Sequence, residues 1–164
     1  MNGERFLHPE HGAGGSSGSE ARVPLMLTKL TGSTRAPSPM EPSKTPRRIL
    51  IVDDDSDGLS SLVMLLTMVG HDICAAQDGL EAVDAAANFE PHIVLLDLDL
   101  PKLNGYDVCR RIRQAPWGRD TVIVAVTGWS DEEHRAEALA AGFDMHLVKP
   151  VSAETFMTVL AAVP

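Results

Sequence analysis

The sequence has few aromatic residues and no long apolar run. Aromatic residues make up 4% of the 164 residues, so a core must be built mainly from Leu, Val, Ile and Ala. The longest apolar stretch, Leu62 to Val69, is far shorter than the ~20 residues that a membrane span needs. The first residues also lack the apolar run of a signal peptide. These absences predict a cytoplasmic protein that does not span a membrane.

Cysteine and histidine are also sparse. Cys74 and Cys109 are too few for a disulfide framework and too far apart for a thiolate metal site, so we expect buried free thiols. The six histidines include no pair spaced as HxH or HxxxH. No zinc site is therefore predicted.

The net charge of −9 is unevenly distributed along the chain. Residues 1–47 contain six Lys or Arg and four Glu, a net of +2, so the remainder carries −11. An acidic domain repels phosphate backbones, which argues against direct binding of nucleic acid.

Composition divides the chain near residue 46. Residues 1–46 are rich in Gly, Ser, Pro and Thr. Such a segment buries too little apolar surface to offset its ordering entropy, so we predict a disordered tail. Residues 47–164 are predicted to form one domain, because the chain is too short for two independent cores.

Within 47–164, short apolar strands alternate with helices. Strands are predicted at Arg48–Val52, Asp72–Ala76, His92–Leu96, Thr121–Val126 and Met145–Val148. Helices are predicted at Ser56–Val69, in an Ala-rich segment that ends at Phe89, and at Tyr106–Gln114, Asp131–Ala141 and Ser152–Ala162. Strands that are apolar on both faces and alternate with helices predict a parallel sheet covered on both sides, a doubly wound α/β fold.

Polar residues follow four of these strands. The first strand ends in Asp53-Asp54-Asp55, the third in Asp97, the fourth in Thr127 and the fifth in Lys149-Pro150. In open α/β sheets the ligand site lies beyond the carboxyl ends of the strands. We therefore expect these acids, this hydroxyl and this ammonium to meet at one edge of the sheet.

Carboxylates gathered at that edge repel each other unless a cation joins them. Hard oxygen ligands suit Mg²⁺, or Mn²⁺ in its place, and we expect Asp53, Asp54 and Asp97 to hold it. Lys149 and Thr127 are suited to holding the oxygens of a phosphoryl group. Such a site can carry out aspartyl-phosphate chemistry, in which a carboxylate attacks phosphorus.

Four stretches now indicate a family. They are ILIVDDD, VLLDLDLPKLNGYDVCRRIR, VIVAVTGWS and AGFDMHLVKPV, and together they resemble the receiver domains of bacterial response regulators. The likeness extends over about residues 47–163, and includes stand-alone chemotaxis-type regulators and the receivers of hybrid histidine kinases. The resemblance implies a five-stranded parallel sheet in the order 2-1-3-4-5 (flavodoxin-like), and a phospho-histidine donor on a histidine kinase or phosphotransfer protein.

The resemblance also implies a role for each matching residue. Asp97 would be the phosphoacceptor, with Thr127 as the switch hydroxyl and Lys149 as the ammonium. Asp54 would bind Mg²⁺ directly and Asp53 through water. The backbone carbonyl of Asp99 would complete the protein ligands, and the bond before Pro150 would be cis.

Three positions depart from the commonest pattern of the family. Asp99 adds a carboxylate two residues after the phosphoacceptor, and Trp129 places a large ring two residues after Thr127. His146 occupies the place where a Tyr or Phe usually swings inward on activation. His146 has either a packing role, which we favour, or a titration near neutral pH.

Two other motif interpretations are weaker. The acids from Asp53 to Asp57 mimic the start of a calcium loop, but the twelfth position is Met64 instead of Glu and a strand precedes the loop. Asp97-Leu98-Asp99 is similar to the nucleophile motif of haloacid-dehalogenase-type phosphatases, which place it on the first strand and need a later acidic pair.

We therefore expect a signalling module whose phosphorylation at Asp97 changes contacts with an unknown downstream protein, and no output domain fused to it. It is not expected to be a turnover enzyme acting in trans. The competing hypotheses are a small phosphatase and an interaction module that works without phosphorylation. Leu59, Val63 and Met68 on the first helix either cover neighbouring loops or form a docking patch for the donor.

Trp129 is expected to shield the acyl phosphate from water. Trp129→Ala should therefore shorten the lifetime of the phosphorylated protein, measured as loss of label after the donor is removed. An unchanged rate of autodephosphorylation would refute the shielding role.

Overall fold

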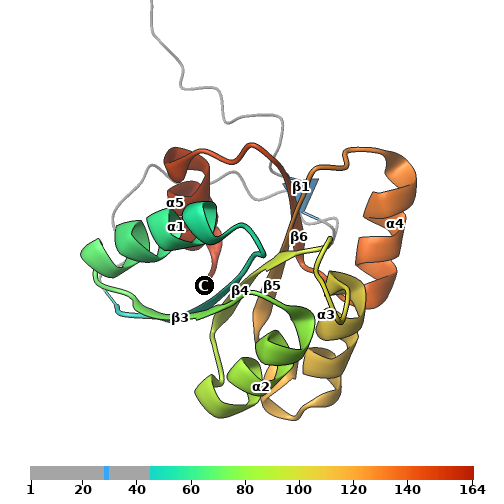
Figure 1. Cartoon of the computed structure of the whole chain (residues 1–164), viewed down its shortest axis with the longest axis horizontal. Coiled ribbons are helices and arrows are strands. Elements are labelled where there is room, and N and C mark those ends of the chain that lie inside the picture. Colours follow the sequence, from blue (N-terminus) through green and yellow to red (C-terminus); the bar gives the residue numbers. More distant parts are fainter. Residues whose placement is uncertain (1–27, 30–44) are drawn as a thin grey trace, which may run out of the picture.

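A computed structural model of the protein describes residues 28–29 and 45–164 (Figure 1). At its centre is a six-stranded sheet in the order β1-β6-β5-β4-β2-β3. The strands are β1 (Thr28–Lys29), β2 (Arg48–Val52), β3 (Asp72–Ala76), β4 (Ile93–Asp97), β5 (Val122–Thr127) and β6 (Met145–Val148). The helices are α1 (Ser56–Met68), α2 (Gly79–Phe89), α3 (Gly105–Gln114), α4 (Glu132–Ala141) and α5 (Ala153–Ala162), with the short 3-10 helix η1 (Trp117–Arg119) before β5.

Strands β2 to β6 are parallel and lie in the order β3-β2-β4-β5-β6. When β2 is counted as the first strand, this is the predicted order 2-1-3-4-5. The short strand β1 was not predicted, and it pairs antiparallel with β6 through His146 and Met145. Apart from β1 and residues 45–46, the predicted disordered tail lies outside the described residues. None of the helices in the described part of the chain is both long and apolar enough to cross a membrane.

Two strands extend one residue further than their sequence patterns suggest. Asp97 pairs with Val126, and Thr127 pairs with Val148, so both polar residues belong to strands. The predictions ended these strands at Leu96 and Val126 because the apolar runs stop there. The backbone ladder continues beyond the last apolar side chain, since its hydrogen bonds do not depend on side-chain type.

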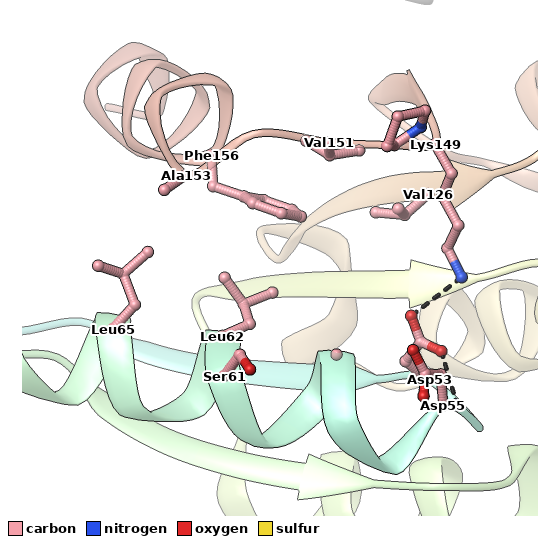
Figure 2. A pocket seen from close by; sticks show the side chains of 12 residues that line it. Asp53, Asp55, Ser61, Leu62, Leu65, Val126, Lys149, Val151, Ala153 and Phe156 are labelled. Carbon is pink, nitrogen blue, oxygen red and sulfur yellow. Dashed lines mark hydrogen bonds and ion pairs between the residues drawn. The ribbon is translucent and has the colours of Figure 1, made fainter.

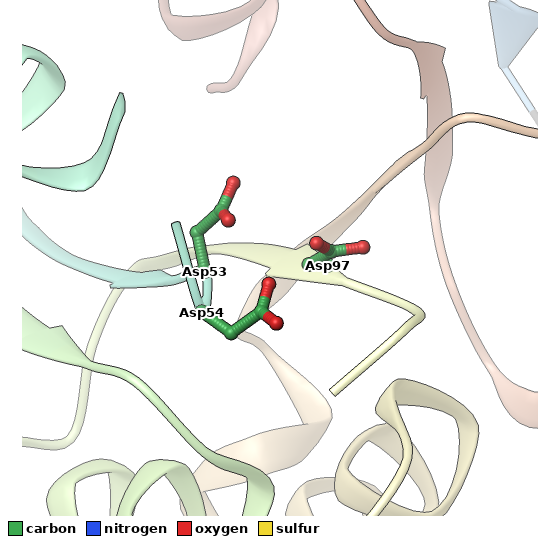
Figure 3. A group of neighbouring side chains, drawn as sticks. All are labelled: Asp53, Asp54 and Asp97. Atoms are coloured by element: carbon green, nitrogen blue, oxygen red, sulfur yellow. The ribbon is translucent and has the colours of Figure 1, made fainter. Parts of the chain in front are cut away.

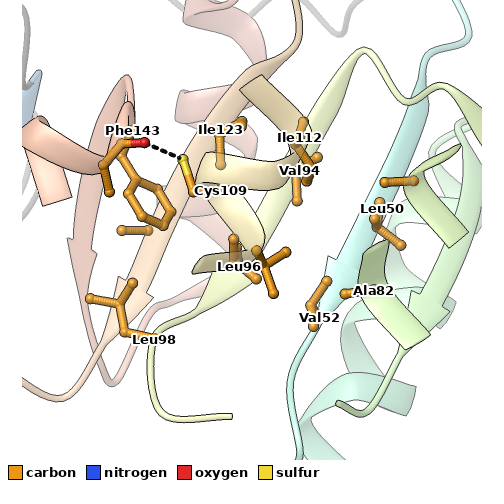
Figure 4. Packing of buried hydrophobic residues seen from close by; sticks show 14 of the residues in the cluster. Leu50, Val52, Ala82, Val94, Leu96, Leu98, Cys109, Ile112, Ile123 and Phe143 are labelled. Atoms are coloured by element: carbon orange, nitrogen blue, oxygen red, sulfur yellow. Dashed lines mark hydrogen bonds between the residues drawn. The ribbon is translucent and has the colours of Figure 1, made fainter. Parts of the chain in front are cut away.

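Helices cover both faces of the sheet (Figure 1). On one face, α1 and α5 bury Leu66 and Val159 against residues such as Ile51 and Leu95. On the other face, α2, α3 and α4 pack over a second cluster, which Figure 4 shows. Cys109 belongs to this second cluster and donates its Sγ–H to the carbonyl of Ala141 at 3.3 Å. Cys109 is a buried free thiol, as predicted, and burial raises its pKa to about 12. Cys74 is also free but only half-buried, because it lies on the edge strand β3, so the prediction of burial was wrong for Cys74.

Each of the five α-helices in the described part of the chain begins at a side chain that accepts a hydrogen bond from the first turn. The five N-cap residues are Asp55, Asp78, Asn104, Asp131 and Ser152. Ser152 confirms its predicted role, in which its hydroxyl accepts from the backbone N–H of Thr155. These caps satisfy N–H groups that the helix itself leaves unpaired, and so they fix where each loop ends.

The two faces of α1 provide a test of the packing. Leu66→Ala, at a residue that is fully buried, should lower the free energy of unfolding by about 2–5 kcal/mol through lost burial and a residual cavity. Met64→Ala on the same helix is the control, because Met64 is 60% exposed, and a change within about 0.5 kcal/mol is expected. Equal effects in urea denaturation would contradict the orientation of α1.

Candidate functional site

The register of the sheet brings the ends of four strands together. Val52 lies opposite Leu96, and Thr127 lies opposite Val148. The residues that follow β2 and β6, and those that end β4 and β5, therefore emerge at one edge. This is the position at which parallel α/β sheets bind their ligands.

Three carboxylates meet at this edge (Figure 3). Asp53 and Asp54 follow β2, and Asp97 ends β4. One carboxylate oxygen from each lies within 4.8 Å of the others. Asp97 is only 4% exposed, whereas Asp54 is exposed and Asp53 is half-buried. Hard oxygen donors at this separation fit a small divalent cation, so the residues present suit Mg²⁺.

Lys149 supplies positive charge to the same group. Its ammonium lies 2.7 Å from Oδ2 of Asp97 and 3.0 Å from Oδ2 of Asp53. Burial works against protonation of Lys149, but the two carboxylates outweigh it and raise the pKa of the ammonium. Lys149 therefore stays charged and joins β2 to β4 across the site.

Both oxygens of Asp97 are hydrogen-bonded. Oδ2 accepts from Lys149, and Oδ1 accepts from the backbone N–H of Asp99 at 3.1 Å. Burial nevertheless raises the pKa of Asp97, because desolvation exceeds the lowering by Lys149 and Asp99, and the Asp53 charge adds to the rise. A carboxylate whose charge is incompletely compensated is suited to gaining a cation.

The loop after β4 is held by a close approach of helix α3. A Cβ at Gly105 would lie 2.3 Å from the backbone oxygen of Asp97, so no larger residue fits without a shift. The N–H of Gly105 also donates to the carbonyl of Leu98 at 3.0 Å. Across the site, the peptide bond between Lys149 and Pro150 is cis, as the resemblance implied.

Thr127 and Trp129 lie next to this group. Thr127 is fully buried, and its hydroxyl oxygen accepts from the backbone N–H of Trp129 at 3.1 Å. The indole N–H of Trp129 donates to Oδ2 of Asp99 at 3.1 Å, while the residue remains 51% exposed. The carboxylate of Asp99 thus faces the indole, and it does not belong to the group of three acids.

His146 lies in the interior instead of at the surface. It is 2% exposed, and its Nε2 has no hydrogen-bond partner within the described residues. Burial lowers the pKa of the imidazole, and the positive charge of Arg135 lowers it further. These features favour the packing role over a titration near neutral pH.

One neighbour of the site was not predicted. The imidazole of His134 stacks on the ring of Trp129, with centroids 5.3 Å apart and planes at 8°. Nδ1 of His134 lies 2.7 Å from Oδ1 of Asp131, the N-cap of α4. The only signal in the sequence was the spacing of three residues between Asp131 and His134, which is too common on helices to indicate a site.

An apolar cavity of about 630 Å³ adjoins the site between α1 and α5 (Figure 2). Asp53 and Lys149 line one end, and Leu62, Leu65 and Phe156 line the apolar part.

The structure separates the two interpretations left open for Leu59, Val63 and Met68 on α1. Leu59 is buried, and Val63 is half-buried and packs against the core, so both favour the packing interpretation. Met64 and Met68 are the strongly exposed apolar residues, at 60% and 79%. They follow a spacing of four residues on the outer side of the helix.

Comparison with known proteins identifies the family. The profile of the response regulator receiver domain matches residues 49–161, which is more than half of the chain. Response regulator MprA of Mycobacterium sp. (strain KMS) is 39% identical over 117 residues, which are 71% of this chain and 50% of that protein. The probable transcriptional regulator ycf27 of Porphyridium aerugineum is 37% identical over 105 residues, 64% of this chain and 42% of that protein. The chain thus spans about half the length of these curated relatives.

Solved structures support the same assignment. The chemotaxis response regulator CheY4 of Vibrio cholerae has a TM-score of 0.69 and 27% identity, covering 73% of this chain and 100% of that one. The receiver domain of sensor histidine kinase PA1611 from Pseudomonas aeruginosa PAO1 has a TM-score of 0.67 and 28% identity, covering 73% and 98%. That structure holds a magnesium ion coordinated in its active site cleft. The chain belongs to the receiver domains of two-component response regulators.

Proposed function

We propose that Asp97 accepts a phosphoryl group from a phospho-histidine on a histidine kinase or phosphotransfer protein. The observation that carries this proposal is the convergence of Asp53, Asp54, Asp97 and Lys149 at one sheet edge. Membership of the receiver-domain family supports it, since receiver domains work with such donors. Because the chain spans about half the length of its curated relatives, we treat the change in contacts with a downstream protein as part of the proposal.

The proposed step exchanges one bond to phosphorus for another. A carboxylate oxygen of Asp97 forms a P–O bond while the P–N bond to the donor imidazole breaks. The electron pair of that P–N bond returns to the ring nitrogen. Lys149 lies within hydrogen-bond distance of the attacking carboxylate and is placed to hold a phosphoryl oxygen as charge redistributes. The Thr127 hydroxyl is the second group suited to this task.

The same acids would hold Mg²⁺ or Mn²⁺. Asp53, Asp54 and Asp97 would supply side-chain oxygens, with the backbone carbonyl of Asp99 as the expected further ligand. A bound divalent ion would neutralise part of the carboxylate charge and polarise the phosphoryl oxygens. We propose that the protein does not act in trans as a turnover enzyme. We also propose that it is located in the cytoplasm.

The apolar cavity between α1 and α5 suggests where the donor docks. It opens beside Asp53 and Lys149, so a protein that fills it would also lie next to the phosphoacceptor. Leu62, Leu65 and Phe156 offer apolar contacts there, and the exposed Met64 and Met68 extend the apolar surface along α1.

Labelling by acetyl phosphate tests the proposal. In the presence of Mg²⁺ the protein should gain one hydroxylamine-labile phosphoryl group per chain, measured by intact mass, and none when EDTA is present. Asp97→Asn should abolish labelling, and Asp54→Asn should slow it at least about tenfold by weakening metal binding.

Asp57→Asn is the matched control, because Asp57 is exposed in the same acidic loop but does not belong to the group of three acids. It should be labelled like the wild type. Full labelling of Asp97→Asn would contradict the proposed acceptor. Sustained hydrolysis of small phosphoesters without a labelled chain would favour the phosphatase alternative.

The raised pKa of Asp97 predicts a stability effect in the absence of metal. A carboxyl whose folded pKa lies above its unfolded value of 3.8 lowers stability at neutral pH, where the folded protein disfavours the ionised form. Asp97→Asn should therefore raise the free energy of unfolding at pH 7 in EDTA. The gain should shrink as the pH falls toward 3.8, because the Asp97 carboxyl then becomes protonated in both the folded and the unfolded state. Urea denaturation measures this difference in the free energy of unfolding. A gain for Asp97→Asn that does not depend on pH, or a loss at pH 7, would contradict the raised pKa of Asp97.

A further inference from the structure

The carboxylate of Asp99 lies near the acid cluster but is directed elsewhere. Its backbone N–H donates to Oδ1 of Asp97, so the residue is attached directly to the phosphoacceptor. Its side chain instead accepts the indole N–H of Trp129 through Oδ2. An aspartate χ1 has three staggered rotamers, so loss of the bond to Trp129 would free the Asp99 carboxylate to take another direction.

Trp129 is held on three sides. Its backbone N–H donates to the hydroxyl of Thr127, its indole N–H donates to Asp99, and its ring stacks on His134. His134 is itself fixed by Asp131, which accepts from its backbone N–H at 3.0 Å and lies 2.7 Å from its Nδ1. The indole is thus braced between the loop after β4 and the first turn of α4.

We infer that Trp129 is a positioning residue that keeps the Asp99 carboxylate out of the metal site and thereby sets which divalent ion the site prefers. The inference rests on the proposed function, because it assumes that Asp53, Asp54 and Asp97 hold the ion. It goes beyond that function by assigning the ion preference to an indole N–H that does not itself bind metal.

The physical reason lies in the number and charge of the oxygen ligands. With Asp99 withheld, the site has three carboxylates and one ammonium. Mg²⁺ requires near-octahedral geometry and usually binds through one or two carboxylates with several waters. Ca²⁺ accepts six to eight oxygens in flexible geometry, so a fourth carboxylate favours the larger ion. Release of Asp99 should therefore shift the preference from Mg²⁺ toward Ca²⁺.

Trp129→Phe separates the indole N–H from the ring. The variant keeps an aromatic ring to stack on His134 and to cover the site, but it removes the donor to Asp99. Isothermal titration calorimetry should show Ca²⁺ binding about tenfold tighter and Mg²⁺ binding changed less than about threefold. The lifetime of the phosphorylated protein should fall less than in Trp129→Ala, because the ring remains.

A double-mutant cycle with Asp99→Asn identifies the group responsible. In the Trp129→Phe background, Asp99→Asn should restore the wild-type ratio of Ca²⁺ to Mg²⁺ affinity. In the wild-type background the same substitution should have little effect on that ratio, because the carboxylate is already withheld. The coupling between the two substitutions is the predicted signature.

His134→Ala provides a second variant that keeps the indole N–H. Loss of the stacking partner should loosen the ring and shift the affinity ratio in the same direction, by less than Trp129→Phe. Trp117→Phe is the control, since Trp117 is the other tryptophan and lines a separate cavity with Arg47, Arg48 and Pro164. It should leave both affinities unchanged.

Two results separate the possible failures. If the wild type binds neither Mg²⁺ nor Mn²⁺, the proposed function itself fails. If the wild type binds Mg²⁺ but the effects of Trp129→Phe and Asp99→Asn are additive, the positioning role of Trp129 is overturned and the proposed function stands.

Discussion

The two ion pairs of Lys149 are the interactions on which the site depends. Three carboxylates from two strands can share one sheet edge only if positive charge is placed among them, because their mutual repulsion grows as they leave water. Lys149 reaches both Asp53 and Asp97, and so it links the end of β2 to the end of β4 from the far side of β5. One ammonium leaves the group with net negative charge, which is a suitable arrangement for a divalent ion.

The fold provides this arrangement through ordinary means. Parallel strands place all their carboxyl ends at one edge, and the apolar clusters on both faces fix the register that decides which residues project there. The close approach of Gly105 to the backbone of Asp97 then fixes the loop that carries Asp99. Function and stability oppose each other at Asp97, because burial raises its pKa while its proposed role as phosphoacceptor requires the ionised form.

Much of this was predictable from the sequence because it rests on short-range patterns. Apolar runs located the five parallel strands, and the residues after each run located Asp53, Asp54, Asp97, Thr127 and Lys149. The sheet order and the role of each residue came from resemblance to a family and did not come from the patterns alone. Strand ends were displaced by one residue at Asp97 and Thr127, since a polar residue can continue a backbone ladder.

Features that depend on tertiary contact were not predictable. The stacking of His134 on Trp129 joins a loop to a helix, and no periodicity signals it. The strand β1 has only two residues, too few for any alternation to appear. Leu59 on α1 and Val69 at its C-cap show the same limit, because a segment that is apolar almost all round does not reveal which face is buried. Leu59 is in fact buried, whereas Val69 is 40% exposed.

The central claim is that one carboxylate among several neighbouring acids takes the phosphoryl group. Borohydride reduction of the phosphorylated protein, followed by peptide mass spectrometry, converts an acyl phosphate to a homoserine residue and so maps its position. The account predicts homoserine at position 97 and intact aspartate at 53, 54 and 99. Homoserine at any of those other positions, or no homoserine at position 97 in fully labelled protein, would contradict it.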